Sequence, residues 1–375
     1  MEPNAADSRI SRRRALKLLA AAGVAASGAY LLYEGTPWLD YEQATAPLRR
    51  PFDRVSTEVA RKRELVRYAT LAANGHNAQP WRFTIHQDAI DIHPDAARRL
   101  PVVDPHDREL WMSLGCALEN LIVAARAMGY APEVTYPDRA DVIQVRLEAS
   151  TAHADPLFDA IPLRQTTRTD YDGQSIPTAD LAQLQALPLE PGVVLHVITD
   201  PAERETVLDY VSQGNLRQYA DRAFVDELIA WLRFNKREAL TSLDGLYSRC
   251  AGNPEVPRWL GQLAVAGTGP QQQADTDARK LRSSPAAVVI ASETDTKTAW
   301  VRAGQVYERL ALTTTVLNIK SALLNQPIEV ADLRGQFQSA MGLSMSLPQL
   351  VLRIGYAAAM PHSPRRPIEH VIVHA

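Results

Sequence analysis

The chain has 375 residues, with 40 Lys and Arg against 43 Asp and Glu, which gives a formal net charge of −3 at pH 7. Because one domain typically has about 100–200 residues, this length predicts two domains. A hydrophobic content of 46% with 22% charged residues excludes long-range disorder, and the mild acidity excludes a general attraction to nucleic acid.

The first 34 residues have the pattern of an export address. Residues 11–17, Ser-Arg-Arg-Arg-Ala-Leu-Lys, resemble the twin-arginine motif, with Ala15 where Phe is usual, and residues 18–33 form an uncharged run of 16 residues. That run is shorter than the roughly 20 apolar residues of a membrane-spanning helix. The alternative is a packed amphipathic helix, but no polar face recurs at helical spacing in this run. We expect residues 1–34 to direct the protein to the twin-arginine translocase, and so to the periplasm or cell envelope.

Cleavage of this address stays open. Residues 27–29, Ser-Gly-Ala, offer a site of small residues, whereas residues 30–33, Tyr-Leu-Leu-Tyr, could extend the apolar run into an uncleaved membrane anchor. The twin-arginine route carries folded proteins, often with a bound cofactor, so the address is also a first indication of a cofactor protein.

A Pro-containing linker over 35–54 leads into alternating helix and strand patterns. Strand-like alternation around residues 81–93 predicts a hairpin, and Gly129 stands where a preceding helix should end. The elements expected in this first part are a helix over 59–73, strands over 81–86 and 90–93, a helix over 114–128 and a strand over 142–147.

A second cycle of helices and strands follows from about residue 156. Interleaved strands and helices together with hairpins predict an α+β fold, with a mixed sheet flanked by helices. The elements expected here are a loop over 170–177, helices over 179–186, within 202–240 and over 304–324, and strands over 193–198, 284–291, 349–354 and 371–373.

Residues 241–282 differ from their surroundings, with glycines at 261, 267 and 269 and a run of Gln at 271–273. We expect this stretch to be structureless, which in a compact protein makes it either a disordered insertion or a functional lid.

Two helices share one local pattern. Residues 115–121 and 304–310 both read Gly-x3-Glu-x-Leu, and each opens an apolar helix that is followed by an alternating strand. Chance can produce such a match, but the shared context favours an ancient duplication.

The most distinctive segment is residues 73–81, Ala-Asn-Gly-His-Asn-Ala-Gln-Pro-Trp. Gly75 permits a tight backbone, and the amide side chains can bind a planar polar heterocycle. A plain turn capped by Asn77 is the alternative. The run Asn77-Ala78-Gln79-Pro80-Trp81 resembles the loop that lies against FMN in the nitroreductase flavoprotein family, although Asn74 and Gly75 stand where that family commonly has Ser.

Three further segments resemble elements of the same family. Residues 164–168, Arg-Gln-Thr-Thr-Arg, resemble the Arg-x-Ser/Thr-x-Arg element that holds the FMN phosphate, as does the basic element near the C-terminus. Residues 327–329, Pro-Ile-Glu, match a run beside the flavin's reactive edge, with Val330 replacing the usual Gly. The resemblance implies the following FMN-binding residues: Asn74, Gly75, His76, Asn77, Gln79, Arg164, Thr166, Arg168, Pro327, Ile328, Glu329, Arg365 and Arg366.

The distribution of these elements is informative, because neither half of the chain contains all of them. Family members are usually homodimers with FMN at the subunit interface, so complementary elements in one chain predict an internal pseudo-dimer around one FMN. This resembles the twin-domain, Acg-like branch, over roughly residues 55–375. The two related halves are then residues 55–155 and 156–375, with the candidate lid at 241–282 in the second.

The resemblance implies an FMN-dependent oxidoreductase that passes two electrons to a small acceptor, such as a nitroaromatic or a quinone. The alternative is an exported protein that sequesters FMN without NAD(P)H turnover, since the predicted location lacks the cytoplasmic reductant. In such a protein the cofactor performs the chemistry, so we assign no catalytic side chain. Nine His and two Cys, Cys116 and Cys250, form neither His-Glu-x-x-His nor Cys-x-x-Cys, so no metal site is expected.

Overall fold

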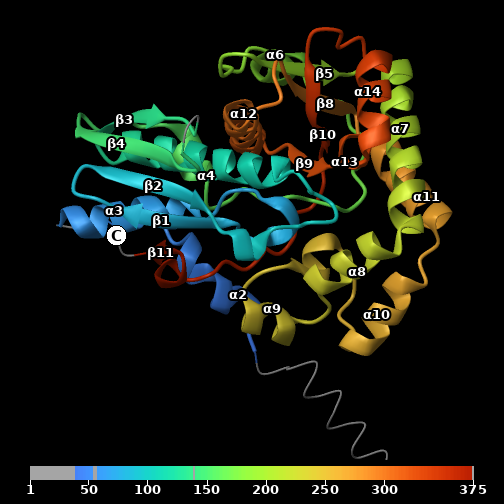
Figure 1. The fold of residues 1–375 in the computed structure, drawn as a ribbon, viewed down its shortest axis with the longest axis horizontal. Helices are drawn as coiled ribbons and strands as arrows, with labels where there is room; N and C mark the ends of the chain where they lie inside the picture. The colour runs from blue at the N-terminus through green and yellow to red at the C-terminus, as the bar shows by residue number, and fades with distance from the viewer. Residues whose placement is uncertain (1–38, 54–56, 138–139, 374–375) are drawn as a thin grey trace, which may run out of the picture.

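The described part of the fold has two main β-sheets, each flanked by helices, and two long helices pack between them (Figure 1). A third, two-stranded parallel sheet is formed by β6 (Leu232–Arg233) and β7 (Leu246–Tyr247). In this computed structural model the described residues are 39–53, 57–137 and 140–373. The predicted export segment and the beginning of the linker lie outside the described residues. The α+β class with a mixed sheet flanked by helices is confirmed by the structure.

The first sheet has five strands in the order β11-β1-β2-β4-β3. The chain's last strand pairs in parallel with β1, through Phe83 opposite Ile372, while the other pairs are antiparallel. The C-terminal strand thereby completes the sheet of the first half, so the predicted division at residue 155 does not separate two independent sheets. The strands are β1 (Trp81–Ile85), β2 (Ala89–Pro94), β3 (Tyr130–Thr135), β4 (Ile143–Ala149) and β11 (Ile372–Val373).

The second sheet has four antiparallel strands in the order β5-β8-β10-β9. Every residue of β8 is buried, and alternate residues enter different cores: Val288 packs in the core that includes α12, and Val289 in the core beneath α7, α11 and α14. Burial on both faces explains why this strand reads as a continuous apolar run. The strands are β5 (Val193–Ile198), β8 (Ala286–Ser292), β9 (Lys320–Leu323) and β10 (Leu347–Gly355).

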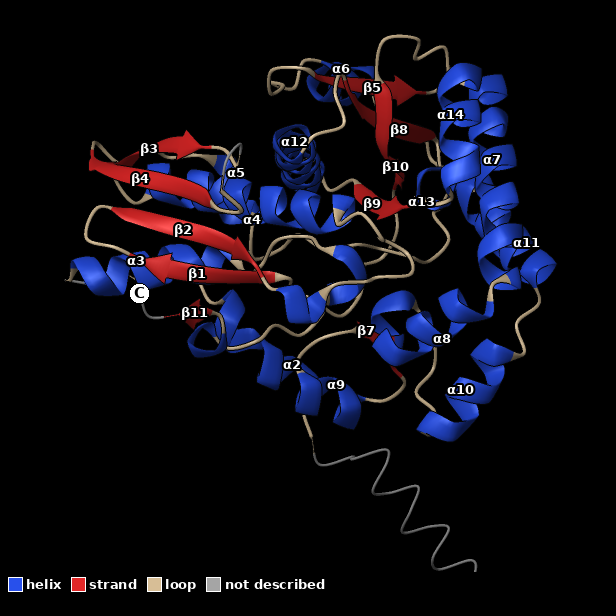
Figure 2. Ribbon diagram, in the orientation of Figure 1, coloured by secondary structure: helices blue, strands red, loops and turns tan. Residues whose placement is uncertain are grey.

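Helices cover both sheets, and Figure 2 shows them between the sheets and along the outer side of the second one. The longer helices are α3 (Glu58–Ala69), α4 (Arg108–Ala127), α6 (Thr178–Gln185), α7 (Pro201–Ala220), α8 (Arg222–Trp231), α10 (Arg258–Ala266), α11 (Pro270–Arg282), α12 (Lys297–Val316) and α14 (Ala331–Ala340). The short elements are α2 (Tyr41–Thr45), η1 (Ala46–Arg49), η2 (Gly75–Asn77), η3 (Ala96–Arg98), α5 (Pro156–Ala160), β6 (Leu232–Arg233), α9 (Lys236–Ser242), β7 (Leu246–Tyr247), η4 (Ser248–Ala251), α13 (Gln326–Glu329) and η5 (Ile368–His370).

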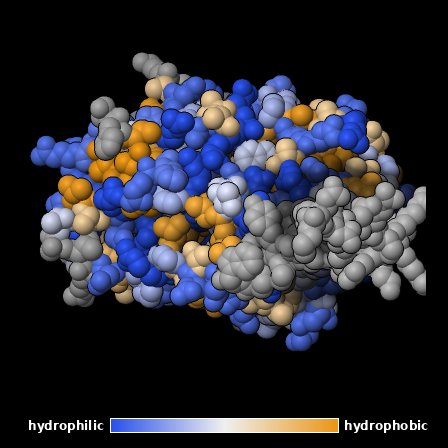
Figure 3. All heavy atoms as spheres, turned by 90° about the horizontal axis from the view of Figure 1, so that it is seen from below, coloured by the Kyte–Doolittle hydropathy of each residue, from blue (hydrophilic) through white to orange (hydrophobic). Residues whose placement is uncertain are grey.

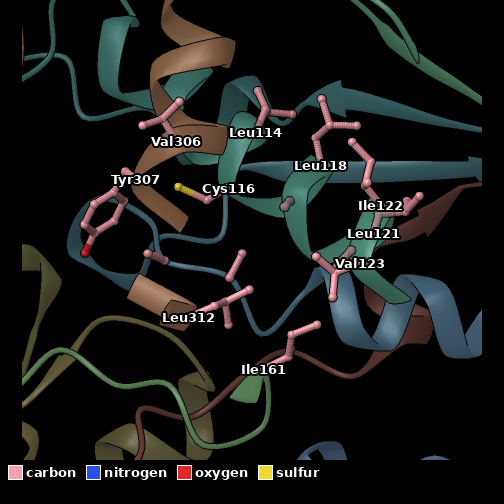
Figure 4. Close-up of a cluster of buried hydrophobic side chains, with 14 of the residues drawn as sticks. Leu114, Cys116, Leu118, Leu121, Ile122, Val123, Ile161, Val306, Tyr307 and Leu312 are labelled. Atoms are coloured by element: carbon pink, nitrogen blue, oxygen red, sulfur yellow. The ribbon is translucent and has the colours of Figure 1, made fainter. Parts of the chain in front are cut away.

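Helices α4 and α12 cross at the two glycines of the repeated Gly-x3-Glu-x-Leu pattern. A Cβ atom on Gly115 would lie 2.0 Å from the Val301 carbonyl oxygen, and one on Gly304 would lie 2.0 Å from the Met112 carbonyl oxygen. The Cys116 thiol, which points toward α12 (Figure 4), donates a hydrogen bond of 3.3 Å to the Gly304 carbonyl. The backbones therefore touch in a nearly symmetrical way, as the two halves of a duplicated unit would.

Length and composition would allow one of the described helices, α4, to cross a membrane, but it is a buried helix of the protein core. On the face shown in Figure 3, hydrophobic residues occur in separate patches among hydrophilic ones.

Several expectations about local structure were wrong. Residues 241–282 are mostly helical, because α10 packs Gly261 against the Phe234 ring and α11 buries an apolar stripe that includes Ala274 and Leu281. The expected linker contains α2 and η1, which bury Tyr41. The helix expected to reach residue 324 ends at Val316, since Asn318 has a φ of 57° and β9 follows. Strand β3 was not expected at all.

Candidate functional site

The loop between α3 and β1 has a strained backbone, and hydrogen bonds to the segment around residues 243–245 stabilise it. His76, Asn77 and Gln79 have φ values of 49°, 53° and 55°, a conformation that costs non-glycine residues of the order of 1 kcal/mol each. The Gln79 amide donates to the Leu243 carbonyl at 2.8 Å, and the Asn77 amide donates to the Gly245 carbonyl at 3.1 Å. Contacts from the distant second half therefore stabilise this first-half loop.

Beside this loop lies a small cationic cavity of about 40 Å³. Four arginines line it, and none of its lining residues is Asp or Glu. The arginines come from three separate parts of the chain: Arg49 from η1, Arg164 and Arg168 from the segment after α5, and Arg365 from the segment before η5. Such a donor set is suited to a compact anion with several oxygens.

Backbone carbonyls after the end of α3 orient two of the arginines. The Arg365 guanidinium donates to the carbonyls of Thr70 at 2.8 Å and Ala72 at 3.0 Å, and to Asn77 Oδ1 at 2.6 Å. Arg164 donates to the Leu71 carbonyl at 3.1 Å. Carbonyls at the C-terminal end of a helix carry partial negative charge, so this is a favourable place for cations.

The positive charges in the cavity are poorly compensated. Arg164 Nε lies 3.0 Å from Glu308 Oε1, whereas Arg168 makes no hydrogen bond or ion pair with any other residue of the described ranges. Burial, and then the neighbouring Arg164, lowers the pKa of Arg365 to about 9. Burial and the charges of Arg365 and Arg164 also lower the pKa of Arg49. A bound anion would relieve this repulsion.

His362 gives a second sign of a missing partner in the same cavity. Its buried Nδ1 has no hydrogen-bond partner among the described residues. Burial, followed by the charges of Arg49, Arg164 and Arg365, lowers its pKa to about 3, so the imidazole is neutral at physiological pH. A buried polar atom left unsatisfied costs free energy, which a hydrogen-bonding ligand would recover.

A larger cavity of about 270 Å³ adjoins the cationic one, and both are lined by Asn74, Arg168 and Leu246. Its walls combine aromatic and aliphatic side chains with amides, carboxyls and three cationic groups, a composition suited to a polar aromatic ring. The remaining lining residues are Gly75, His76, Glu109, Asn215, Gln218, Tyr219, Phe224, Leu228, Gln273, Asp277, Lys280, Ala322, Leu323, Leu324, Asn325, Gln326, Glu329 and Arg353.

His76, in this larger cavity, is a neutral side chain. Burial, and then the charge of Arg168, lowers its pKa to about 4. Its ring can therefore both donate and accept a hydrogen bond, and its strained backbone fixes where the ring lies.

The structure brings most of the predicted residues together. Nine of the predicted residues line one cavity or both: Asn74, Gly75, His76, Asn77, Arg164, Thr166, Arg168, Glu329 and Arg365. The other four line neither. Pro327 and Ile328 are buried in α13. The Arg366 backbone N–H donates a hydrogen bond of 2.8 Å to Gln79 Oε1, so these two residues stabilise the loop without lining either cavity.

Sequence reasoning missed several lining residues. Arg49 lies in the segment expected to be a linker, and Leu246 in the segment expected to be structureless. Asn325 and His362 belong to no motif of their own, although Asn325 lies two residues before the Pro-Ile-Glu run and His362 directly precedes the basic element near the C-terminus. Glu109 lies within residues 104–110, Asp-Pro-His-Asp-Arg-Glu-Leu, a segment that resembles the Acg-like branch and so was a usable signal. Among the described residues, no group of three or more His, Cys, Asp or Glu could hold a metal ion.

Comparison with known proteins gives relatives along most of the chain, although no protein-family model matches it. A protein of Mycobacterium tuberculosis named "Putative NAD(P)H nitroreductase" is 26% identical over 329 residues, covering 83% of this chain and 90% of the relative. A second, with the same name and the designation acg, is 26% identical over 338 residues, covering 86% and 97%. The similarity spans both halves.

Solved structures of smaller proteins match part of the chain. An FMN-dependent nitroreductase of Mycobacterium smegmatis, in complex with NADPH, is 13% identical and covers 57% of this chain and 96% of its own, with a TM-score of 0.39. A nitroreductase of Bacteroides fragilis with bound FMN is 15% identical and covers 55% and 90%, with a TM-score of 0.33.

Proposed function

We propose that this chain is an FMN-dependent oxidoreductase of the nitroreductase family, in its twin-domain, Acg-like branch. The observation that carries the proposal is the pair of adjoining cavities, one lined by four arginines and no acid, the other lined by polar and aromatic side chains. The names of the full-length relatives support it.

The residues present fit FMN. Arg49, Arg164, Arg168 and Arg365 would hold the phosphate, because their charge has no anion among the residues that line the cavity. The unsatisfied His362 Nδ1 lies in the same cavity. The isoalloxazine ring would occupy the larger cavity, and bound FMN would accept two electrons and pass them on as a hydride.

The cavities are built jointly by the two halves, as an internal pseudo-dimer with one FMN requires. Residues 74–77 come from the first half, and the phosphate-binding arginines at 164, 168 and 365 come from the second. The glycine crossing of α4 and α12 supports the duplication.

A small planar acceptor, quinone-like or nitroaromatic, is the substrate class that we propose. Tyr219 and Phe224 line the larger cavity and offer faces on which such a ring can stack.

One observation favours a second candidate function, in which the protein sequesters FMN. The Gly245 backbone N–H donates to the Asn77 carbonyl at 3.2 Å, so the segment carrying Leu246 is tied over the junction of the two cavities. A ligand held under this segment would exchange slowly.

The cofactor is tested with the full chain and with Arg168→Ala. We expect one FMN per wild-type polypeptide, and at least a tenfold loss of FMN affinity in R168A with little loss of apoprotein stability, because this side chain makes no hydrogen bond or ion pair within the described ranges and lies beside other arginines. Arg279→Ala removes an arginine from a surface ion pair with Asp170 and is the matched control. A colourless wild type, two FMN per chain, or equal affinity in R168A would refute the assignment.

Oxidoreductase and storage functions are separated by anaerobic reduction. NADH, NADPH and dithionite are added in separate samples, followed by a quinone or a nitroaromatic. Bleaching by a nicotinamide and multiple turnovers with the acceptor would support the oxidoreductase. Bleaching by dithionite only, with no turnover and an FMN half-life on the protein of hours, would support sequestration.

Export by the twin-arginine route is proposed on the pattern of residues 11–17. Cell fractionation of the wild type and of a double Arg12→Lys, Arg13→Lys variant tests it. Periplasmic or envelope recovery is expected for the wild type only, and equal recovery of both in the cytoplasm would refute it. The mass of the recovered protein would show whether the segment is cleaved or retained as an anchor.

A further inference from the structure

Helix α10 exposes its apolar side instead of burying it. Its exposed residues share the absence of a polar side chain, and they are Trp259, Leu260, Leu263, Ala264 and Ala266. At about 3.6 residues per turn they lie on one continuous side of the helix. The opposite side contains Gly261, the one buried residue of α10, which packs against the Phe234 ring. The whole solvent-facing side of α10 is therefore apolar.

The large side chains of this face stand out from the rest of the surface. In the described ranges eleven large hydrophobic side chains are exposed, and three of them, Trp259, Leu260 and Leu263, belong to this nine-residue helix. The other eight are distributed over several distant segments. A surface helix of a globular protein normally turns its charged side to the solvent, and a contiguous apolar patch marks an interaction site. The face of α10 is thus a candidate binding surface.

A cationic hollow of about 240 Å³ borders this face. Arg258 from the start of α10, Arg237 from α9 and Arg233 from β6 line it, together with Glu238. Arg258 pairs with Glu238 at 3.0 Å and Arg233 with Asp244 at 2.7 Å, so three arginines face two carboxylates. An apolar helix face bordered by arginines is typical of helices that lie on an anionic bilayer, because the arginines reach the lipid phosphates.

The chain enters the described fold close to the same surface. Leu39 is the first described residue, and Tyr41 in the following α2 packs with Ala239 of α9 and lies 4.6 Å from the Tyr247 ring, between centroids. Helix α9 also supplies Arg237 to the hollow, so one short helix separates α2 from it. Figure 1 shows α2, α9 and α10 along the lower edge of the molecule.

The length of chain before Leu39 indicates what covers the face. The uncharged run of residues 18–33 ends six residues before Leu39. Because an extended chain spans at most about 3.6 Å per residue, the run must end within about 20 Å of Leu39. When the run is retained as an anchor, the bilayer surface therefore lies beside α9 and α10. This short tether favours a lipid surface over a second copy of the chain or a protein partner.

We propose that α10 is a membrane-binding helix, whose apolar face lies among the lipids of an anionic bilayer while the arginine hollow beside it binds a lipid phosphate. The inference goes beyond the flavin assignment and does not depend on it. A single short amphipathic helix binds a bilayer weakly, and stable attachment takes two signals. Residues 18–33 are the second signal, and the two attachments together hold the protein on the envelope in one orientation.

The test places one fluorescent label on the full chain and asks whether lipid touches it. Cys116 and Cys250 are buried, so a thiol-reactive label attaches at an introduced cysteine. Leu263→Cys puts the label on the α10 face, and Val59→Cys is the matched control, because Leu263 is 65% and Val59 66% exposed and Val59 lies on α3, far from α10 in Figure 1.

The labelled chains are mixed with vesicles of phosphatidylcholine and phosphatidylglycerol whose brominated acyl chains quench a label in contact with them. We expect at least twofold quenching at position 263 and none at position 59, because only the α10 face enters the lipid. A chain that sediments with the vesicles through its N-terminal run while the label at 263 stays unquenched would overturn the proposal. Equal quenching at both positions would overturn it as well.

The arginine hollow is tested by Arg237→Ala in the chain labelled at 263. A basic residue near an anionic surface contributes about 1 kcal/mol, so half-maximal quenching should need about fivefold more anionic lipid. With phosphatidylcholine alone, the variant and its parent should behave alike. Arg146→Ala, which removes an exposed arginine of the first sheet, is the control and should behave as its parent in both lipids. An equal requirement for anionic lipid with and without Arg237 would overturn the role of the hollow.

A second copy of the chain is the competing occupant of this face. Analytical ultracentrifugation and the emission of the label at 263 are recorded without lipid over a range of protein concentrations. The proposal expects no blue shift of the label as the concentration rises. Dimers that form together with a blue shift at 263 would assign the face to self-association and overturn membrane binding. The FMN content of the same samples tests the proposed function separately.

Discussion

The crossing of α4 and α12 at Gly115 and Gly304 is the contact that we expect to tolerate substitution least. In Gly115→Ala the new methyl carbon would lie 2.0 Å from the Val301 carbonyl oxygen, whereas ordinary contacts begin at 3.4 Å. The atom that it meets belongs to the backbone of a 20-residue helix, so no side-chain rotation can relieve the clash. The two helices must move apart by more than 1 Å, or one must bend.

The magnitude follows from two opposing effects. Overpacking of a close-packed interface costs about 1–3 kcal/mol, and more where the backbone must move. Replacing Gly by Ala inside a helix returns about 0.5–1 kcal/mol. Because a backbone atom is met here, the cost should lie at the upper end, about 3 kcal/mol or more. We therefore expect a net loss of about 2 kcal/mol or more in the free energy of unfolding of G115A, and a similar loss in Gly304→Ala. The double variant should lose less than the sum, because one separation of the helices relieves both clashes.

Urea unfolding followed by fluorescence and circular dichroism measures these changes. Gly335→Ala is the matched control, since Gly335 also lies within a helix, α14, and no atom comes within 4 Å of its Cβ position. This control should gain about 0.5–1 kcal/mol from helix propensity alone. If G115A and G304A were as stable as the wild type while G335A gained stability, the backbone contact between α4 and α12 would not exist as described.

Further outcomes follow from the buried charges and the cavity wall. Because the pKa of Glu109 is raised, the folded protein keeps a proton that the unfolded chain loses, so stability should fall as the pH rises from about 4.5 to about 8. The urea midpoint of E109Q should vary less with pH over this range than that of the wild type. For Asp295, burial opposes ionisation, but hydrogen bonds, led by that of Arg334, outweigh it and hold the pKa of Asp295 well below its usual range. The protein should therefore lose stability as the pH falls below about 4. Asp295→Asn should remove this loss from acid unfolding curves, and unchanged curves would contradict the assignment. Leu246→Glu would place a carboxylate at the junction of the two cavities, where Arg168 also lies, and fluorescence titration should show at least a tenfold weaker affinity for FMN, whereas Leu246→Met should bind normally.

The sequence by itself determined the elements whose signal is local. Alternation over residues 81–93 predicted the β1–β2 hairpin, and the structure pairs the two strands antiparallel, with Phe83 opposite Ile92. The apolar helices that became α4 and α12, and the buried strand β8, were also readable, because side-chain period depends only on neighbouring residues. The α+β class followed from their order.

Local signals failed where tertiary contacts decide the conformation. Residues 258–282 form α10 and α11 although glycines and glutamines suggested a loop, because burial of one face against the rest of the protein outweighs weak propensity. The sequence likewise gave no reason to end α12 before residue 324, whereas the left-handed Asn318 and the pairing of β9 with β10 do so.

For the candidate site, the motifs identified the loop and most of its arginines, but not the cavities. Arg49, Glu109 and Leu246 are far apart in sequence, and neither Arg49 nor Leu246 belongs to a recognisable motif, yet all three line the same pair of cavities. Their proximity depends on the glycine crossing of α4 and α12 and on the C-terminal strand that returns to the first sheet. Residue type and spacing fix what a side chain can do chemically, whereas burial and the charges that surround it are properties of the folded chain.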